Sequence, residues 1–288
     1  AYCGDDYNSV MVSTTDSLIT CSTLRGGLCV RRNKETLDTE ESSGIFRLVS
    51  DDSSPAVGIF LNLSISNSGN GQNIVLFAKN CTKLPETSLE SHAIFSVSPD
   101  LSAKRNYEDI FDLILSDPGR QIMDYRVVIE NENFIFLLVN QNSQSKLVKI
   151  CKTVESSQVY EDIPIMCNLD GVNLTHVDHG TFLSVSGKTI LVALFSNLRI
   201  RKSSVCIFEE SEIYEAFLQS RKDRFECPSH DLQAADVLFK NELSDFNLKN
   251  CVNLTEVSYQ LHSIPVSYTH LRAHETSLHL VCRLLLEK

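Results

Sequence analysis

Histidines and an acid near the end of the chain have a spacing that could hold a metal ion. His270 and His274 lie four residues apart, and Glu275 follows directly. On a helix this spacing would place two imidazoles on one face, as many zinc sites do. No second pair of ligand residues accompanies them, so the pattern by itself does not predict a zinc site.

The segment that contains these histidines, residues 265–288, resembles no domain and looks like a translated sequencing-adapter tail. Such segments are set aside before the fold is interpreted. We therefore expect residues 1–264 to form the native domain and residues 265–288 to be non-native. The chain also opens at Ala1 without an initiator Met or a signal peptide, so we interpret it as an internal piece of a longer protein.

His176, Asp178 and His179 form a second group that could move a proton. No nucleophile motif such as G-x-S-x-G accompanies them, and we expect them to be polar residues of a turn. The sequence therefore predicts no catalytic residues, no metal site and no cofactor, and hence a protein that is not an enzyme.

Acidic residues exceed basic ones, and the formal net charge is −11. We expect Glu155, Glu161 and Asp162 to belong to a solvated acidic face. Because an acidic surface repels phosphate backbones, nucleic acid is excluded as a partner. No run of eighteen apolar residues occurs, so we expect no transmembrane helix within this piece. Any membrane attachment would come from other parts of the parent protein.

The chain contains 10 cysteines, which is many for its length but too few for a small disulfide scaffold. It also contains four N-x-[ST] sequons, the acceptor motif of N-linked glycans. The sequon asparagines are Asn62, Asn80, Asn173 and Asn253. Together, the cysteines and the sequons favour an extracellular, oxidised and glycosylated domain.

Short β-branched and aliphatic runs recur along the chain, separated by clusters of Asn, Gly, Ser and Asp that close hairpins. The runs cover residues 9–13, 18–21, 28–31, 56–63, 73–78, 93–97, 126–130, 133–139, 146–152, 182–185, 189–195 and 204–208. Residues 210–222 predict a helix, because Ile213, Phe217 and Leu218 recur on one helical face. Many short strands with one helix predict an all-β sandwich, barrel or propeller.

The expected strands fall into four groups that longer polar connections separate. These groups lie near residues 7–32, 43–97, 121–167 and 174–209. This grouping favours four-stranded antiparallel blades repeated around an axis, in which no blade can bury both of its faces alone. A piece with about four or five blades leaves the ring of a propeller open.

Two stretches near the start of the chain carry a resemblance to a known family. Residues 5–12 and 18–32 combine an apolar strand with Cys21 and Cys29 at eight-residue spacing, with Gly27 before the second cysteine and basic residues after it. This stretch resembles the early sema-domain segment of plexins, the semaphorin receptors. Further similar stretches follow in plexin order at residues 125–139, 149–151, 164–167, 204–213 and 239–243. The chain departs from the plexin pattern in two ways: the cysteine after residues 239–243 comes late, and a common "nqplGG" motif is missing.

The resemblance covers most of residues 5–255 and implies a partial seven-bladed β-propeller, the sema domain, with a short helical insertion. It implies the ectodomain of a single-pass plasma-membrane receptor that binds the sema domain of a semaphorin in cell guidance. Receptor self-association is a second candidate contact. Three alternatives stay open: the related sema domain of hepatocyte-growth-factor-receptor kinases, a semaphorin, and, more remotely, an extracellular propeller enzyme. The last would be expected to carry a repeated Asp-box, which the chain lacks.

The resemblance also implies where the ligand would be contacted. In plexins, loops between strands of the third and fourth blades contact the semaphorin. The corresponding loops here contain Asp117 and Arg120, and Gln141 and Asn142.

The spacing of the first two cysteines predicts a local disulfide. Cys21 and Cys29 flank residues 25–27, a Gly-rich turn that is flexible enough to bring two antiparallel strands to a bridgeable separation. Cys206 lies in an apolar strand, where we expect a buried free thiol. Cys81 lies inside its own sequon, so a disulfide there would crowd a glycan.

The other pairings come from the plexin resemblance alone. It implies that Cys167 pairs with Cys227, and that Cys151 pairs with Cys251 or with a cysteine beyond the chain. We expect Cys3 to pair with a residue that precedes Ala1.

Overall fold

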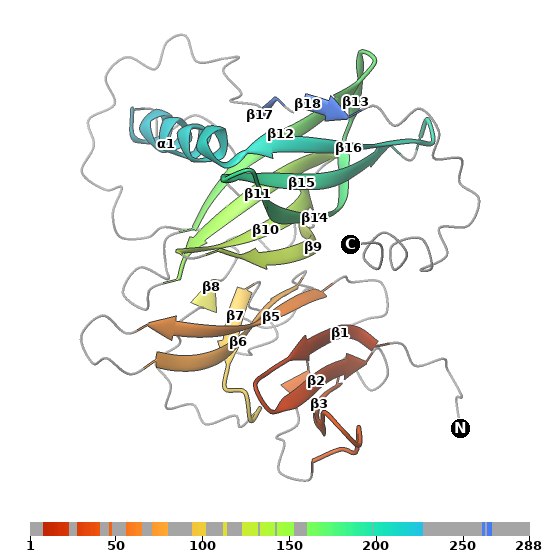
Figure 1. Ribbon diagram of the computed structural model, residues 1–288, viewed down its shortest axis with the longest axis vertical. Coiled ribbons are helices and arrows are strands. Elements are labelled where there is room, and N and C mark those ends of the chain that lie inside the picture. Colours follow the sequence, from red (N-terminus) through yellow and green to blue (C-terminus); the bar gives the residue numbers. More distant parts are fainter. Residues whose placement is uncertain are drawn as a thin grey trace.

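The computed structural model consists mainly of β-strands, which form four sheets in chain order (Figure 1). The structure describes residues 8–22, 28–40, 46–47, 56–64, 71–79, 94–101, 112–113, 123–131, 133–141, 143–152, 160–197, 199–226, 261–262 and 264–266. Consecutive strands within each sheet pair antiparallel, as hairpin-connected strands do. We name the four sheets I to IV.

The strands of each sheet have the following bounds. Sheet I contains β1 (Asn8–Ser13), β2 (Ser17–Ser22), β3 (Leu28–Asn33) and β4 (Phe46–Arg47). Sheet II contains β5 (Ala56–Ser64), β6 (Gly71–Lys79), β7 (Ile94–Val97) and β8 (Asp112–Leu113). Sheet III contains β9 (Met123–Glu130), β10 (Phe134–Gln141), β11 (Gln144–Cys151) and β12 (Tyr160–Leu169), with β13 (Val172–Leu174) and β17 (Leu261–His262) paired to β12. Sheet IV contains β14 (His176–Val185), β15 (Lys188–Asn197), β16 (Lys202–Glu209) and β18 (Ile264–Val266).

The first strands of successive sheets lie next to one another. Strand β1 contacts β5, β5 contacts β9, and β9 contacts β14. Each later strand of a sheet is hydrogen-bonded one step farther from this shared inner position, which is how the blades of a β-propeller are built. The predicted grouping of strands into four sets is confirmed, with corrections at the boundaries. The fourth group does not begin at Leu174, because Leu174 belongs to β13 and pairs with β12 of sheet III. The second group does not begin near residue 43, because β4 pairs with β3 and completes sheet I.

Apolar side chains fill the spaces between neighbouring sheets. Three clusters of buried residues lie between sheets I and II, II and III, and III and IV. In β10, Ile135, Leu137 and Val139 belong to the cluster with sheet II, whereas Phe136 and Leu138 belong to the cluster with sheet IV. Because side chains alternate along a strand, sheet III packs on both of its neighbours.

Sheets III and IV approach closely at Gly180 in β14. A Cβ atom at this position would lie 2.5 Å from the Cδ1 atom of Leu138 and 3.1 Å from the carbonyl oxygen of Val192. A larger residue there would force the Leu138 side chain to shift and would crowd the carbonyl of Val192, so a glycine suits this close approach.

The helix α1 (Glu210–Glu226) follows β16 and is four residues longer than predicted. Ile213 and Phe217 are buried in the cluster between sheets III and IV, as expected from the sequence. Leu218 does not share their face, because 54% of it is exposed. The Nζ atom of Lys149 lies 4.6 Å from the ring centroid of Phe217, a cation–π contact that joins α1 to β11.

Strand β12 was not expected, and it overturns the prediction of a solvated acidic face. Glu161 and Asp162 are only 7% and 2% exposed. Asp162 pairs with Lys146 at 3.3 Å and Glu161 with Lys149 at 2.8 Å. A buried carboxylate needs such a partner, and β11 provides both lysines across the ladder. Glu155 lies outside the described residues.

The described chain reaches slightly past the predicted domain boundary at residue 264. Strand β18 pairs with β16, and Pro265 and Val266 take part in this pairing. The rest of residues 265–288, with His270, His274 and Glu275, lies outside the described residues. Within the described part of the chain, no helix has the length and apolar character that a membrane span requires.

Candidate ligand-binding surface

Strand registers bring several hairpins and strand ends to one end of sheets III and IV. Met123 at the start of β9 pairs with Gln141 at the end of β10, and Gln141 also pairs with Gln144 at the start of β11. In sheet IV, His176 at the start of β14 pairs with Ser196, which in turn pairs with Ser203 near the start of β16. We call this end of the two sheets the hairpin end.

Asn140 joins the two sheets at the hairpin end. Its Nδ2 donates to the carbonyl oxygen of Val177 at 2.9 Å, and its Oδ1 accepts from the amide of Val177 at 2.8 Å. Ser145 donates to the same Oδ1 at 3.1 Å. The amide of Asn140 thus takes the place of a neighbouring strand on the inner edge of β14, where backbone groups would otherwise lack partners.

A charged cluster lies beside this amide. The guanidinium of Arg126 contacts the Oδ2 of Asp124 at 2.6 Å and the Nε2 of His176 at 2.9 Å. A guanidinium has only donors, so Nε2 of His176 is the acceptor in this hydrogen bond. The carboxylate of Asp178 lies 3.6 Å from the same Nε2.

The cluster corrects the expected location of the histidines. His176, Asp178 and His179 lie in strand β14 rather than in a turn, and a β-bulge between Val177 and His179 interrupts the pairing with β15. A bulge changes the direction of side chains along a strand. Arg126, from a different sheet, supplies the main partner of His176, and such a contact cannot be inferred from neighbours in the sequence.

The cluster links β9 of sheet III to β14 of sheet IV through side chains. Within the described residues, the side-chain partners of His176 are Asp124, Arg126, Asn140 and Asp178, none of which is a nucleophile of the hydroxyl or thiol type. Among these residues no group of three His, Cys, Asp or Glu is arranged to hold a metal ion. Arg126 and Asp124 form an ion pair within β9, and Arg126 and Asn140 link this pair to His176 of sheet IV.

The loops that the plexin resemblance singled out are only partly described. Gln141 lies at the end of β10 and is 4% exposed, so its side chain is not available to a ligand. The exposed residues of this hairpin are Ser143, which has a positive φ of 64°, and Gln144. Asn142, Asp117 and Arg120 lie outside the described residues.

Three asparagines make hydrogen bonds within and between two neighbouring hairpins at the hairpin end. Asn168 in β12 donates to the Oδ1 of Asn173 in β13 at 2.8 Å. Asn197 at the end of β15 donates to the carbonyl oxygen of Asn173 at 3.2 Å. We call the β12–β13 and β15–β16 hairpins together the double hairpin.

Local hydrogen bonds also fix both turns of the double hairpin. Asp170 and Gly171 have φ values of 53° and 78°, as a two-residue type I′ turn requires. The amide of Gly171 donates to the Oδ1 of Asn168 at 3.0 Å. In the other turn, the amides of Arg199 and Ile200 donate to the Oδ1 of Asn197 at 3.1 and 3.4 Å.

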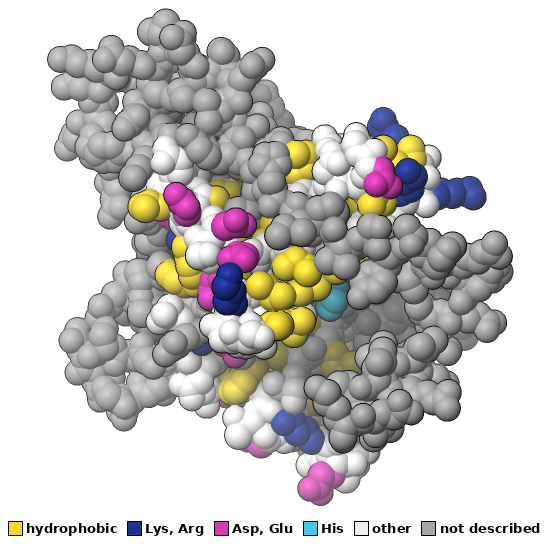
Figure 2. All heavy atoms as spheres, turned by 45° about the horizontal axis from the view of Figure 1, so that its top comes forward, with side chains coloured by type: hydrophobic (Ala, Val, Ile, Leu, Met, Phe, Trp, Pro, Cys, Tyr) yellow, Lys and Arg dark blue, Asp and Glu magenta, His cyan; other side chains and the backbone are white. Residues whose placement is uncertain are grey.

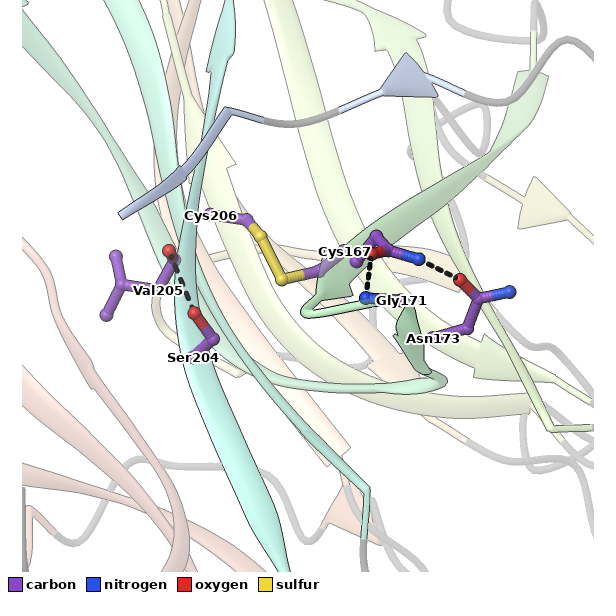
Figure 3. The surroundings of a disulfide bond; sticks show 7 residues. Cys167, Gly171, Asn173, Ser204, Val205 and Cys206 are labelled. Carbon is purple, nitrogen blue, oxygen red and sulfur yellow. Dashed lines mark hydrogen bonds between the residues drawn. A yellow bond between two sulfur atoms is a disulfide. The ribbon is translucent and has the colours of Figure 1, made fainter. Parts of the chain in front are cut away.

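A disulfide lies at the base of the double hairpin and corrects two predictions. Cys167 in β12 bonds to Cys206 in β16, with Cα atoms 5.9 Å apart (Figure 3). The expected pairing of Cys167 with Cys227 is therefore wrong, and Cys206 is not a free thiol. Cys206 lies on the face of sheet IV that packs on sheet III, which places it opposite Cys167. Its position in an apolar strand did not reveal this partner.

The predicted disulfide in sheet I is confirmed. Cys21 and Cys29 are directly paired residues of β2 and β3, and they form a disulfide with Cα atoms 4.0 Å apart. Cys227 and Cys251 lie outside the described residues, and so does the side chain of Cys151. The expectations for Cys3 and Cys81 also fall outside them.

Two of the four predicted glycosylation sites are described, and both asparagines are exposed. Asn62 lies near the end of β5, and Asn173 lies in β13 within the double hairpin. An exposed side chain is what attachment of a glycan requires. Asn80 and Asn253 lie outside the described residues.

The sequence does not single out Asn140, the residue whose amide joins the two sheets at this surface. Asn140 ends an apolar strand, and its polar side chain gave no sign of whether it faced solvent or another sheet. The asparagines of the double hairpin were visible only as turn formers, apart from the sequon at Asn173. Only the Asp170-Gly171 pair carried a recognisable local signature, that of a type I′ turn.

Comparison with known proteins supports the architecture. No protein-family model matches the chain, and no match was found among the curated proteins. Among solved structures, the chain is similar to the plexin A4 full extracellular region with domains 1 to 8, with a TM-score of 0.56 and 16% identity. The similarity covers 92% of this chain and 34% of that one. A second plexin A4 structure, with domains 1 to 10, gives the same TM-score and is covered to 27%.

A semaphorin structure is similar to nearly the same degree. Semaphorin 2a from Drosophila gives a TM-score of 0.52 at 15% identity, over 74% of this chain and 39% of that one. The chain therefore spans well under half of each of these structures. At such identities the likeness concerns the fold, and the chain folds as part of a sema-type β-propeller.

Proposed function

We propose that this chain is the ligand-binding part of a plexin-like receptor, and that it recognises the sema domain of a semaphorin by protein–protein contact. The fold supports the assignment of the chain to a sema domain. The Cys21–Cys29 disulfide supports the assignment to a plexin-like protein, because it lies in the block of sequence that most resembles plexins. The finer assignment to a receptor rather than to a ligand rests on that block.

The hairpin end of sheets III and IV is the observation that carries the proposal. Exposed turns gather there on a base that a disulfide, the Asn140 amide and the Arg126 cluster hold together. Loops held on a rigid scaffold are a common basis for recognition of another protein. The hairpin that follows Gln141 belongs to this end, where the plexin resemblance places ligand contacts.

An extracellular location on a plasma-membrane receptor is part of the same proposal. Disulfides persist in oxidising compartments, and the described residues contain two of them. Both described sequon asparagines are exposed, so glycans at Asn62 and Asn173 would meet no steric barrier from the described strands. A semaphorin remains the second candidate, because the Drosophila semaphorin has the same fold.

A biosensor experiment separates these candidates. The chain, within its complete ectodomain, is immobilised and titrated in parallel with semaphorin sema domains and with plexin ectodomains. Saturable binding to at least one semaphorin is expected. Binding to a plexin ectodomain and to no semaphorin would instead identify the chain as a semaphorin, and binding to neither would contradict the proposal.

Two matched serines test whether the hairpin end is the contact. Ser143 and Ser186 both lie at hairpin turns with positive φ, 64° and 52°, but at opposite ends of their sheets. Ser143→Arg should weaken semaphorin binding by at least about tenfold, because a bulky charge would enter the contact. Ser186→Arg should leave the affinity within about twofold of wild type. Equal effects of the two variants would exclude the hairpin end as the site of semaphorin contact.

A further inference from the structure

The tip of the β15–β16 hairpin is basic and apolar on a chain that is acidic overall. Arg199, Arg201 and Lys202 are exposed, and Ile200 between the two arginines is 45% exposed. The net charge of the whole chain is −11. Three cations around one exposed aliphatic side chain therefore give this tip a charge opposite in sign to the net charge of the chain.

The tip is held in one conformation before any partner arrives. The Oδ1 of Asn197 accepts from two backbone amides of the turn, and its Nδ2 ties the hairpin to Asn173. The disulfide of Cys167 and Cys206 joins the two hairpins at their base. A surface that is already ordered loses little conformational entropy on binding, so more of its contact energy becomes affinity.

We propose that the tip of the β15–β16 hairpin is the contact for an acidic protein surface with an apolar recess, in which the three cations meet carboxylates and Ile200 enters the recess. The proposal rests on the proposed function in that it names the chemistry of the ligand's surface. Opposite charges would speed association and set the orientation, whereas burial of Ile200 would slow dissociation.

The chemistry of the tip favours a protein over a sulfated polysaccharide. A polysaccharide chain offers no apolar recess to an aliphatic side chain such as that of Ile200. Asp170 is also exposed in the adjacent turn of the double hairpin, and its carboxylate would repel a uniformly anionic polymer. A protein surface with patterned charge avoids this repulsion.

Charge reversal at the tip is the first test. The Arg199→Glu/Arg201→Glu variant should bind semaphorin at least about tenfold more weakly than wild type, mainly through slower association, and with less dependence on salt. Lys188→Glu is the matched control, because Lys188 is a 70% exposed cation at the opposite end of sheet IV. It should stay within about twofold of wild type. Equal losses for the two sites would overturn the proposal.

A second pair of variants separates the apolar contact from the positioning of the turn. Ile200→Ser should weaken binding about fivefold through faster dissociation, with the salt dependence unchanged. Asn197→Ala removes two hydrogen bonds of the turn and the one to Asn173, and it should lower the affinity while leaving the thermal midpoint close to that of wild type. Unchanged binding of the Ile200→Ser variant would show that Ile200 does not enter an apolar recess of the partner.

A peptide selection tests the surface even if no semaphorin binds. A displayed library of random peptides is selected on the wild-type ectodomain, with the Arg199→Glu/Arg201→Glu variant as competitor. Peptides with Asp and Glu around a large apolar residue should be enriched. Absence of such peptides would overturn the proposal. So would tight heparin binding that this variant abolishes, because it would identify a sulfated polysaccharide as the ligand.

Discussion

Sheets III and IV are neighbours with similar apolar content, yet they differ in how many of their faces are covered. In β10 of sheet III, every residue after Phe134 is buried. In β15 of sheet IV, buried and exposed residues alternate: Leu191 is fully buried, whereas Leu194 is 40% exposed. Sheet III lies between two sheets, and sheet IV packs on one.

The exposed face of sheet IV nevertheless has the composition of a covered one. Leu183, Val185 and Leu194 are 46%, 51% and 40% exposed on it, and Figure 2 shows hydrophobic side chains gathered in a patch on the molecular surface. Large exposed apolar patches are uncommon on isolated domains. The difference in burial between the two sheets therefore reflects what packs on them as well as their residues.

The largest expected difference concerns two lysine–carboxylate pairs. Lys146→Met should cost about 3 to 5 kcal/mol in the free energy of unfolding, because Asp162 of sheet III would keep a buried charge without its lysine. Lys188→Met breaks an exposed pair with Glu209 in sheet IV and should cost at most about 1 kcal/mol. Urea unfolding of the complete ectodomain measures both. Equal costs would mean that the two pairs are equally solvated.

The disulfide between sheets III and IV should stabilise the protein more than the one within sheet I. Cys167 and Cys206 are 39 residues apart, whereas Cys21 and Cys29 are 8 apart. By chain entropy, replacing both cysteines with alanine should cost about 4 kcal/mol for the first pair and about 2.5 kcal/mol for the second. Thermal midpoints of the two double variants provide the comparison. Peptide mapping that links Cys167 to Cys227 would contradict the assignment.

Two leucines in central strands test directly whether the sheet face that carries each of them is covered by another element. Leu137 in β10 is fully buried, and Leu194 in β15 is partly exposed. Leu137→Ala should cost about 3 kcal/mol, since the cavity lies in a closed core. Leu194→Ala should cost less than about 1 kcal/mol, in proportion to the smaller area that it buries. A large cost for Leu194→Ala would show that another element covers this face.

The smallest expected effect concerns Tyr214 of α1, at the end of sheet III opposite the hairpin end. Burial raises the pKa of Tyr214, the hydrogen bond from Asn131 lowers it, and the nearby carboxylate of Glu210 raises it further. The raised pKa favours the neutral phenol, so its contribution to stability is complete below the ordinary tyrosine pKa of about 10. That contribution is lost as the pH rises through the raised value.

An absorbance titration checks the Tyr214 prediction. The phenolate signal that distinguishes wild type from Tyr214→Phe should develop above the pH at which free tyrosine ionises. Stability of the wild type should also fall more steeply than that of the variant on the alkaline side. Ionisation of Tyr214 at the ordinary pH would argue against its packing with Asn131 and Glu210.

The fold was largely predictable from local patterns. Alternating apolar residues and turn clusters located most strands, and the grouping of strands indicated blades. Strand β12 was not predicted, because Glu161, Asp162 and Pro164 are typical of a polar connection between strands. Its charges become compatible with a buried strand only through Lys146 and Lys149 of β11, which are more than ten residues away in sequence.

The candidate surface was less predictable than the fold. The resemblance to plexins pointed to the hairpin after Gln141, which does lie at the hairpin end, although Gln141 itself is buried. The contacts that hold this end together join residues far apart in sequence: Asn140 with Val177, and Cys167 with Cys206. None of these residues has a neighbour in sequence that indicates its partner.

The sequence by itself determined what depends on a few consecutive residues. It specified most of the strands, the α1 helix with Ile213 and Phe217 inward, and the Cys21–Cys29 disulfide across one hairpin. Backbone conformation and side-chain alternation act over such short ranges.

Only the tertiary structure decided which sheet faces are covered and which distant polar groups meet. The burial of Asp162, the Asn140 contact with Val177 and the Cys167–Cys206 disulfide all depend on strand register within a sheet or on packing between sheets. A strand's own residues determine which side chains share a face, but only its neighbours determine what that face meets.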